Sequence, residues 1–398
     1  MIALITLMGY AKPRSGRLGE VGDTVVLEAE NEAGGEKVTR GKGRGSNFFA
    51  LEPEVLERLW KLPTANRLNL ALTYLVLLAG TGSDHRLTKW SAKACDEYVG
   101  VGKPRAKAAI EELIAGGLVE RTENSSRMLP QYRLPGLPRD AEPIFLPMQI
   151  VTGFTHETPI LRRVRECGDP LLLRMLIDLY GLVTTDAMHG IPLGNLCGGR
   201  CSDERPTARK LAETGAHAVW AFQAGGVQTA KGEWAGLHSA KGAKGLEWQP
   251  FWDRLKMLRQ IGAIYDEPWI FSGEADDAEP LLPLDHSGFY AVAKPTLEAQ
   301  VTFRAIEACH ALVGPERSYL FEQGYEYMLP LPVHHQQPAY RLVTRMRAEA
   351  DTPGHRRAYA QRRTLLESRL YSLEQIVADA AAGQFARPPR QRTRAGAA

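Results

Sequence analysis

The sequence is short of cysteine, and the cysteines that it has are scattered. Five occur among 398 residues, and they are Cys95, Cys167, Cys197, Cys201 and Cys309. A small disulfide-stapled scaffold would be denser in cysteine and would carry an even number. The pattern therefore excludes that class and predicts a protein of the reducing cytoplasm.

Long apolar runs and a strong net charge are also missing. No run approaches the ~20 apolar residues that span a bilayer. The apolar start MIALITLM follows no basic segment and leads into AKPRSGR, so we expect neither a signal peptide nor a membrane partner. The formal net charge is only +3, so local clusters must decide whether nucleic acid is a partner.

Enzyme signatures are absent as well. The chain has no G-x-S-x-G, no H-E-x-x-H and no paired-carboxylate motif. GVGK at 100–103 begins like a phosphate-binding loop, but a polar segment precedes it and the third glycine of the dinucleotide fingerprint is missing. Pro104 stands where a Walker loop needs Ser or Thr. We expect no cofactor, and a DNA-processing enzyme is kept only as an alternative.

Two groups of residues could be metal ligands, but neither has the arrangement that a metal site needs. Cys197 and Cys201 form the only close cysteine pair, and His189 and His217 lie in the same region, but a zinc finger needs a second ligand pair. We therefore interpret the pair as ordinary thiols. The adjacent His334 and His335 would point to opposite sides of a strand, which does not suit a relaxase-type metal pair. We predict no metal site.

One further set of residues is attributed to chance. It loosely resembles the basic residues and tyrosine of tyrosine recombinases, and it consists of Arg341, Arg345, His355, Arg356 and Tyr371. Any arginine-rich helical region produces such matches, so we assign no catalytic residues.

The residues that are present indicate a mainly α protein with small β-hairpins, of α+β class. The apolar stretches NRLNLALTYLVLLAG and DPLLLRMLIDLYGLV predict two central buried helices. LLESRLYSLEQIVADAAAG predicts an amphipathic helix near the end of the chain. We expect six segments: a flexible basic arm (1–47), a first unit (48–138), a linker (139–168), a second unit (169–285) with an insertion (187–247), a helical region (286–385) and a disordered basic tail (386–398).

The two units end in a similar way. In the first, a helix ends at Gly116-Gly117, and LVERT and RMLPQYRL form a hairpin around ENSS. In the second, WQPFWDRLKMLRQIGAIYDEPWIF predicts an amphipathic helix, a glycine and a hairpin turned at Asp266-Glu267-Pro268. HAVWAFQAGGVQTAKGEW in the insertion predicts another hairpin, around Gly225-Gly226. We infer two copies of one module.

The most informative stretch is YVGVGKPRAKAAIEELIAGGLVERTE at 98–123. Ala106, Ala109, Ile110, Leu113 and Ile114 recur at helical spacing and predict one core-facing stripe. The opposite face carries small residues, with Lys103, Arg105 and Lys107 at its N-terminal end. A helix start offers free N–H groups and a positive dipole end, which phosphates favour. Glu111 and Glu112 lie farther along, so we expect only the first two turns to enter a groove.

Residues 66–134 resemble a winged helix-turn-helix domain. The resemblance is carried by SAKACDEYVGVGKPRAKAAIEELIAGGLVER, with its short helix, glycine turn and second helix, and by the strand RMLPQYRL. It implies binding of double-stranded DNA, with Lys103, Arg105 and Lys107 in the major groove and Arg121 and Arg127 of the wing on the backbone or minor groove. We add Lys89 to this set, and Arg254, Lys256 and Arg259 from the second unit.

Tandem units of this kind, with helical and basic extensions, resemble the layout of plasmid replication initiators. The layout would equally serve a transcriptional regulator of a plasmid, phage or other mobile element, acting as a dimer or along repeated sites. The alternative from another class is a scaffold subunit whose winged helices bind protein. The nearly neutral total charge and the pair Glu111-Glu112 favour that alternative.

Overall fold

A computed structural model describes most of residues 47–385. Its description omits the following positions within that range: 83, 127, 137–141, 186–189, 193–195, 197–207, 223–235, 243–244, 274, 276–277, 286–294, 315–326 and 336. The chain divides into Met1–Arg44 and Gly45–Ala398, and every element named below belongs to the second of these units. The expected arm (1–47, except for its last residue), the basic tail (386–398) and the turn at Gly225-Gly226 lie outside the described residues.

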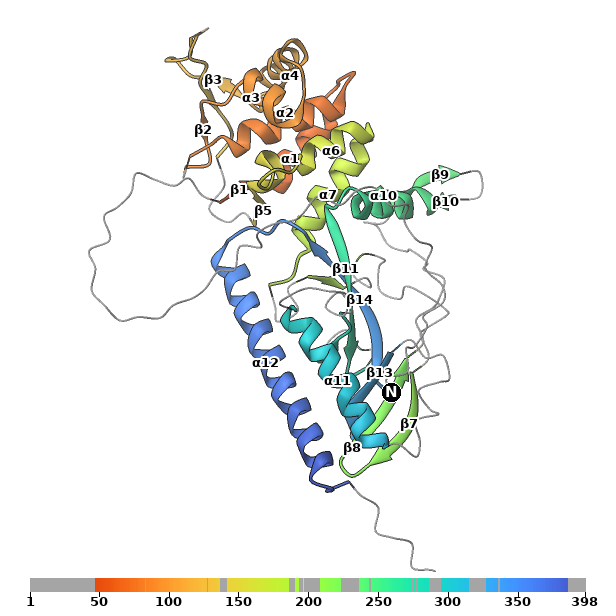
Figure 1. Ribbon diagram of the computed structural model, residues 1–398. Coiled ribbons are helices and arrows are strands. Elements are labelled where there is room, and N and C mark those ends of the chain that lie inside the picture. The colour runs from red at the N-terminus through yellow and green to blue at the C-terminus, as the bar shows by residue number, and fades with distance from the viewer. Residues whose placement is uncertain are drawn as a thin grey trace, which may run out of the picture. The chain divides into compact units, whose positions relative to one another are not determined.

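The fold is mixed α+β, with long helices and small antiparallel sheets (Figure 1). Its first elements are β1 (Phe48–Leu51), α1 (Pro53–Lys61), α2 (Arg67–Ala79), β2 (Leu87–Thr88), α3 (Ala92–Val99), α4 (Lys103–Ala115), β3 (Glu120–Arg121) and β4 (Tyr132–Arg133). Asn66 caps α2 by accepting a hydrogen bond from the Asn69 N–H at 3.1 Å. The strands β2, β4 and β3 form one sheet in that order, so the predicted hairpin around ENSS is confirmed.

The next elements connect this part of the chain to its second half. They are β5 (Ile144–Pro147), α5 (Gln149–Thr152), α6 (Ile160–Cys167) and α7 (Pro170–Leu182). Strand β5 pairs antiparallel with β1, with Phe49 opposite Leu146. Asp169 caps α7 by accepting a hydrogen bond from the Leu171 N–H at 2.8 Å. Both predicted apolar helices, α2 and α7, are thus present and largely buried.

A four-stranded sheet forms the centre of the remaining chain. Its order is β12 (Pro280–Pro283), β11 (Ile264–Phe271), β14 (Ala339–Met346) and β6 (Ile191–Pro192), and the helix α10 (Gln249–Gln260) leads into β11. A second sheet has the order β13 (Tyr327–Pro332), β8 (His217–Phe222) and β7 (Ala208–Thr214), and β9 (Ala240–Gly242) pairs with β10 (Gly245–Glu247). The helices α11 (Leu297–Val313) and α12 (Pro353–Ala381) pack against each other.

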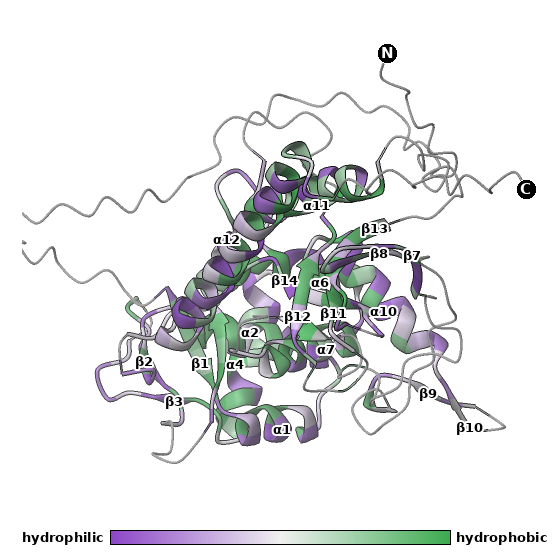
Figure 2. Ribbon diagram, turned by 90° about the horizontal axis from the view of Figure 1, so that it is seen from below, coloured by the Kyte–Doolittle hydropathy of each residue, from purple (hydrophilic) through white to green (hydrophobic). Residues whose placement is uncertain are grey.

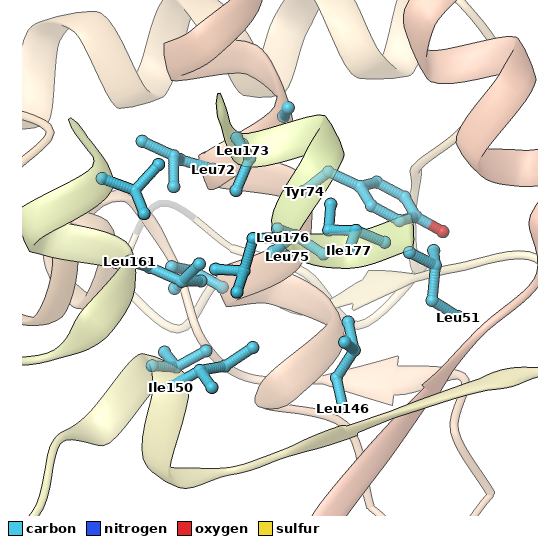
Figure 3. Packing of buried hydrophobic residues seen from close by; sticks show 14 of the residues in the cluster. Leu51, Leu72, Tyr74, Leu75, Leu146, Ile150, Leu161, Leu173, Leu176 and Ile177 are labelled. Carbon is cyan, nitrogen blue, oxygen red and sulfur yellow. The ribbon is translucent and has the colours of Figure 1, made fainter. Parts of the chain in front are cut away.

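Two clusters of buried hydrophobic residues hold these elements together. The first core extends from Phe49 to Ala348 and is built mainly by β1, β5 and the helices α1 to α7 and α10. Figure 3 shows its centre, where Leu72 and Leu75 of α2 lie among Leu146, Ile150 and Leu161. The second core gathers β8, β11, β12, β13, α11 and α12. Helix α12 carries hydrophobic and hydrophilic residues side by side (Figure 2) and buries Leu366, Leu373 and Ile376, as expected of an amphipathic helix.

The sheets of the two halves share an order of elements. In the first half, α2 is followed by β2, and α4 is followed by β3 and β4, with β4 in the middle of the sheet. In the second half, α7 is followed by β6, and α10 is followed by β11 and later β14, with β14 between β11 and β6. The helix ends match as well, because Gly117 and Gly262 both adopt positive φ, at 65° and 69°. Each closes the same pair of backbone hydrogen bonds, namely those of a Schellman motif.

Three expectations about the chain's organisation were wrong. Residues 139–168 are no linker, because β5, α5 and α6 lie there and bury Ile150, Leu161 and Val164 in the first core. No hairpin turns at Asp266-Glu267-Pro268, since β11 runs straight through these residues and pairs with β14 along its length. The region 286–385, expected to be helical, contains α11 and α12 but also β13 and β14, which complete sheets begun earlier in the chain.

Candidate nucleic-acid interface

The turn between α3 and α4 directs the start of α4 outward. Ser91 begins α3 by accepting a hydrogen bond from the Lys93 N–H. Gly100 ends that helix in the left-handed region, and the Val101 side chain is buried. Gly102 precedes α4 and has no side chain to cap it, so the N–H groups of the first turn have no side-chain partner from their own N-cap residue.

Helix α4 separates an apolar face from a basic end, as its sequence predicts. Ala106, Ala109, Ile110 and Leu113 are buried and Ile114 is half-buried, against α2 and α3. Pro104 is the second residue of the helix, where its missing N–H leaves no bond unmade. The other face is exposed from its first turn onward.

Three basic side chains gather at this exposed start, and we call Lys103, Arg105 and Lys107 the α4 basic cluster. All three are exposed. None forms an ion pair with any residue that the structure describes. Their charges therefore add to the positive end of the helix dipole instead of being neutralised.

The wing contributes less basic charge than its sequence suggests. Arg121 of β3 pairs with Glu111 of α4, although both side chains are more than half exposed. An exposed pair of this kind is worth about 0–1 kcal/mol, so a phosphate can compete for the arginine. Arg127 lies outside the described residues, and Lys89, just after β2, is exposed.

Several exposed basic residues of this region were missed in the sequence, namely Arg86, Lys93 and, on the wing, Arg133. Arg133 of β4 lies opposite Glu120 of β3 and Leu87 of β2, on the exposed side of the three-stranded sheet. Its neighbour Tyr132 is buried. The alternation of a buried and an exposed residue in QYRL was the available signal, since strand neighbours point to opposite faces.

In the second half, helix α10 corresponds to α4, but its arginines form ion pairs within the protein. Arg254 of α10 forms an ion pair with Asp169 at 2.6 Å and donates to the His238 carbonyl oxygen, and its side chain is only 16% exposed. Arg259 forms an ion pair with Asp266 at 2.7 Å. Of the three basic residues expected to bind DNA here, Lys256 alone is exposed. The structure gives the two arginines contacts that tie α10 to α7 and β11.

Asp169 and Arg254 belong to a longer chain of polar contacts, which is buried only in part. The His238 ring lies 3.2 Å from an Asp178 carboxylate oxygen and is fully buried. Asp178 also accepts a hydrogen bond from Arg174, which reaches Glu57 of α1. These contacts join α1, α7 and α10 and indicate a structural role for the charges of this region.

Among the described residues, no group of possible metal ligands gathers into a site. Cys197, Cys201 and His189 lie outside the described residues, and no group of three potential ligands occurs among the residues that are described. His334 and His335 follow β13 in a turn, so their rings lie 4.2 Å apart, contrary to the expectation that they point apart. Burial raises the pKa of the Cys95 thiol to about 12, which keeps it protonated and unreactive at neutral pH.

The residues resembling the tyrosine recombinase set are separated in space. His355 and Tyr371 lie on the same helix, α12, sixteen positions apart, or ~24 Å at 1.5 Å per residue. Arg345 is buried against Glu267, while Arg341 donates to the backbone oxygens of Gly273 and Ala275. We therefore assign no catalytic role to these residues, and the prediction that the chain has no catalytic residues remains a prediction.

Comparisons with protein-family models, with curated proteins and with solved structures find no match. Within the part of the chain that the structure describes, no helix combines the length and the apolar composition needed to cross a membrane.

Proposed function

We propose that this chain is a sequence-specific double-stranded DNA-binding protein whose residues 66–134 form a winged helix-turn-helix domain. The observation that carries the proposal is the α4 basic cluster, which is exposed and has no ion-pair partner among the described residues. Such a helix start suits the major groove, where N-terminal residues of a recognition helix reach base edges. The order α2, β2, α3, α4, β3, β4 and the sheet order β2-β4-β3 support the same domain type.

The proposal extends to a tandem arrangement. The repeated element order of the second half and its matching Schellman motif support a second module of the same kind. Because Arg254 and Arg259 are engaged within the protein, we assign base recognition to the first module. The second module supplies Lys256 as an exposed basic residue. We place the protein in the cytoplasm, on the nucleoid.

We infer a role in replication initiation or transcription regulation of a plasmid, phage or other mobile element. The tandem layout is what favours replication, since two modules suit repeated origin sites. Sequencing of the duplex fragments that the full chain selects from a random pool distinguishes the two roles. Directly repeated sites support an initiator, whereas a single palindrome bound by a dimer supports a regulator.

Replacement of Arg105 tests the interface. Arg105→Ala is expected to weaken binding of the selected site by ~1–3 kcal/mol and to relax the preference at one base position, because a guanine would lose a bidentate partner. Gel-shift titration of the wild-type site and its single-base variants measures both effects. Arg357→Ala on α12 is the matched control, because it removes one exposed positive charge far along the chain.

Equal affinities and unchanged base preference in the Arg105 variant would contradict the role of the α4 basic cluster. The alternative function, a scaffold that binds protein through the same surface, is favoured by the exposed Glu111 and Glu112 on α4. That alternative predicts no salt-dependent shift of any duplex by the wild-type chain.

A further inference from the structure

The tip of the β3–β4 hairpin is an organised turn. We define the wing tip as residues 122–126 and 128–131, which are the described residues between β3 and β4. The Thr122 N–H donates to the Gln131 oxygen at 3.1 Å, and the Ser126 N–H donates to the Leu129 oxygen at 3.1 Å. The Ser125 and Ser126 hydroxyls accept from the N–H groups of Gln131 and Leu129, each at 3.0 Å. Side chains as well as backbone thus set the shape of this turn.

This turn presents two adjacent hydrophobic side chains to water. Met128 is 87% exposed and Leu129 is 76% exposed, which are the largest values among the exposed large hydrophobic residues of the described chain. Single exposed apolar residues need no explanation, but here a hydrogen-bonded turn holds two of them at one projecting point. Removal of apolar side chains of this type from water is favourable, so a partner that covers both gains binding energy.

The surroundings of the wing tip favour DNA as that partner. Arg121 and Arg133 are exposed on the two strands that carry the tip, and the α4 basic cluster lies on the helix that leads into β3. Leu129 is four residues from Arg133, or at most ~13 Å along an extended chain. The minor groove is ~7.5 Å deep, so this upper limit on the reach of the tip exceeds the depth of the groove.

We propose that Met128 and Leu129 form an apolar wedge that enters the minor groove beside the site read by α4, unstacks a base step and bends the duplex. Methionine and leucine are among the side chains that proteins insert between base pairs in this way. Flexible pyrimidine–purine steps open most easily, so the wedge adds a preference for such a step outside the bases that α4 contacts. This inference rests on the proposed function and adds DNA bending to it.

The test uses the full chain, its selected duplex, and a 2-aminopurine label placed at successive steps next to the α4 site. Wild-type protein is expected to raise the 2-aminopurine fluorescence severalfold at one step and to bend the duplex in a circular-permutation gel assay. M128S/L129S, whose side chains stay exposed and should not disturb folding, is expected to lose most of the fluorescence rise and most of the bend. M128L/L129M keeps two apolar side chains and is expected to retain both signals.

Leu237→Ser is the matched control, because Leu237 is also exposed, at 61%, but lies far from the wing in the chain. Its fluorescence signal and bend should equal those of the wild type. Two results would overturn the wedge but leave DNA binding intact. In the first, M128S/L129S bends the duplex and unstacks the base step as the wild type does. In the second, the wild type binds without unstacking any step. If the wild type shifts no duplex in a salt-dependent manner, the proposed function itself is overturned, and a protein partner for the wing tip becomes the alternative.

Discussion

At the scale of single residues, buried charges are placed where they join elements that are distant in the chain. Glu267 of β11 contacts Arg345 of β14 and lies 2.7 Å from Arg362 of α12, and all three side chains are at most 9% exposed. Arg362 also lies 2.7 Å from Glu298 of α11. One carboxylate therefore holds a strand and a helix to β11, in a region where each unpaired charge would be costly.

Glu267→Gln should lower the free energy of unfolding by ~3–5 kcal/mol, because two buried arginines would lose their shared negative partner. Urea unfolding followed by circular dichroism measures the change. Glu367→Gln is the control, since its partner Arg363 is exposed on α12, and it should leave stability nearly unchanged. Similar unfolding midpoints for both variants would mean that the buried network contributes little.

At the scale of elements, the two module-like halves share the way in which a helix passes into a strand. Gly117 follows α4 and Gly262 follows α10, both with positive φ, and both donate to the carbonyl oxygen three residues earlier. A side chain at either position would strain the backbone, because residues other than glycine disfavour this conformation. The same device thus sets the direction of β3 and of β11.

Gly117→Ala and Gly262→Ala should each destabilise the protein by ~1–2 kcal/mol, the cost of a left-handed residue with a Cβ atom. Thermal unfolding measures the effect. Gly181→Ala provides a control of opposite sign, because Gly181 lies in α7 and an added Cβ would meet Ile144 only at an ordinary 3.5 Å. That variant should be neutral or stabilised by up to ~1 kcal/mol. A loss of stability in the control equal to that in the other two variants would remove the conformational explanation.

The helices could be predicted from the sequence because their signal is local. The strands were difficult to predict because each depends on a partner that is distant in the chain. The helices α2, α4, α7 and α10 follow from apolar residues that recur within one short stretch. Strand β14 could not be assigned, because its partner β11 ends at Phe271 and β14 begins only at Ala339. For the candidate site, the α4 basic cluster was predictable from spacing. The engagement of Arg254 and Arg259 was not, since it depends on Asp169 and Asp266 meeting them in the fold.

At the scale of the whole described unit, we expect elements that share a buried core to unfold together, even where they are distant in the sequence. The first core collects side chains from β1, α2, β5, α6, α7 and α10, so the expected boundaries at residues 138 and 168 fall within it. The second core collects β8, β13, α11 and α12, together with β11 and β12. Loss of packing in one core should therefore loosen all elements of that core, whatever their distance in sequence.

Leu146→Ala and Leu329→Ala test this organisation, because each removes a fully buried leucine, the first from β5 and the second from β13. Each should cost ~2–5 kcal/mol through lost burial and a residual cavity. Hydrogen exchange read by mass spectrometry should show faster exchange in α2, α7 and α10 for Leu146→Ala, and in β8 and α11 for Leu329→Ala. If Leu146→Ala affected only the peptide that contains it, residues 139–168 would behave as the linker first expected, and the pairing of β5 with β1 would not carry the first core.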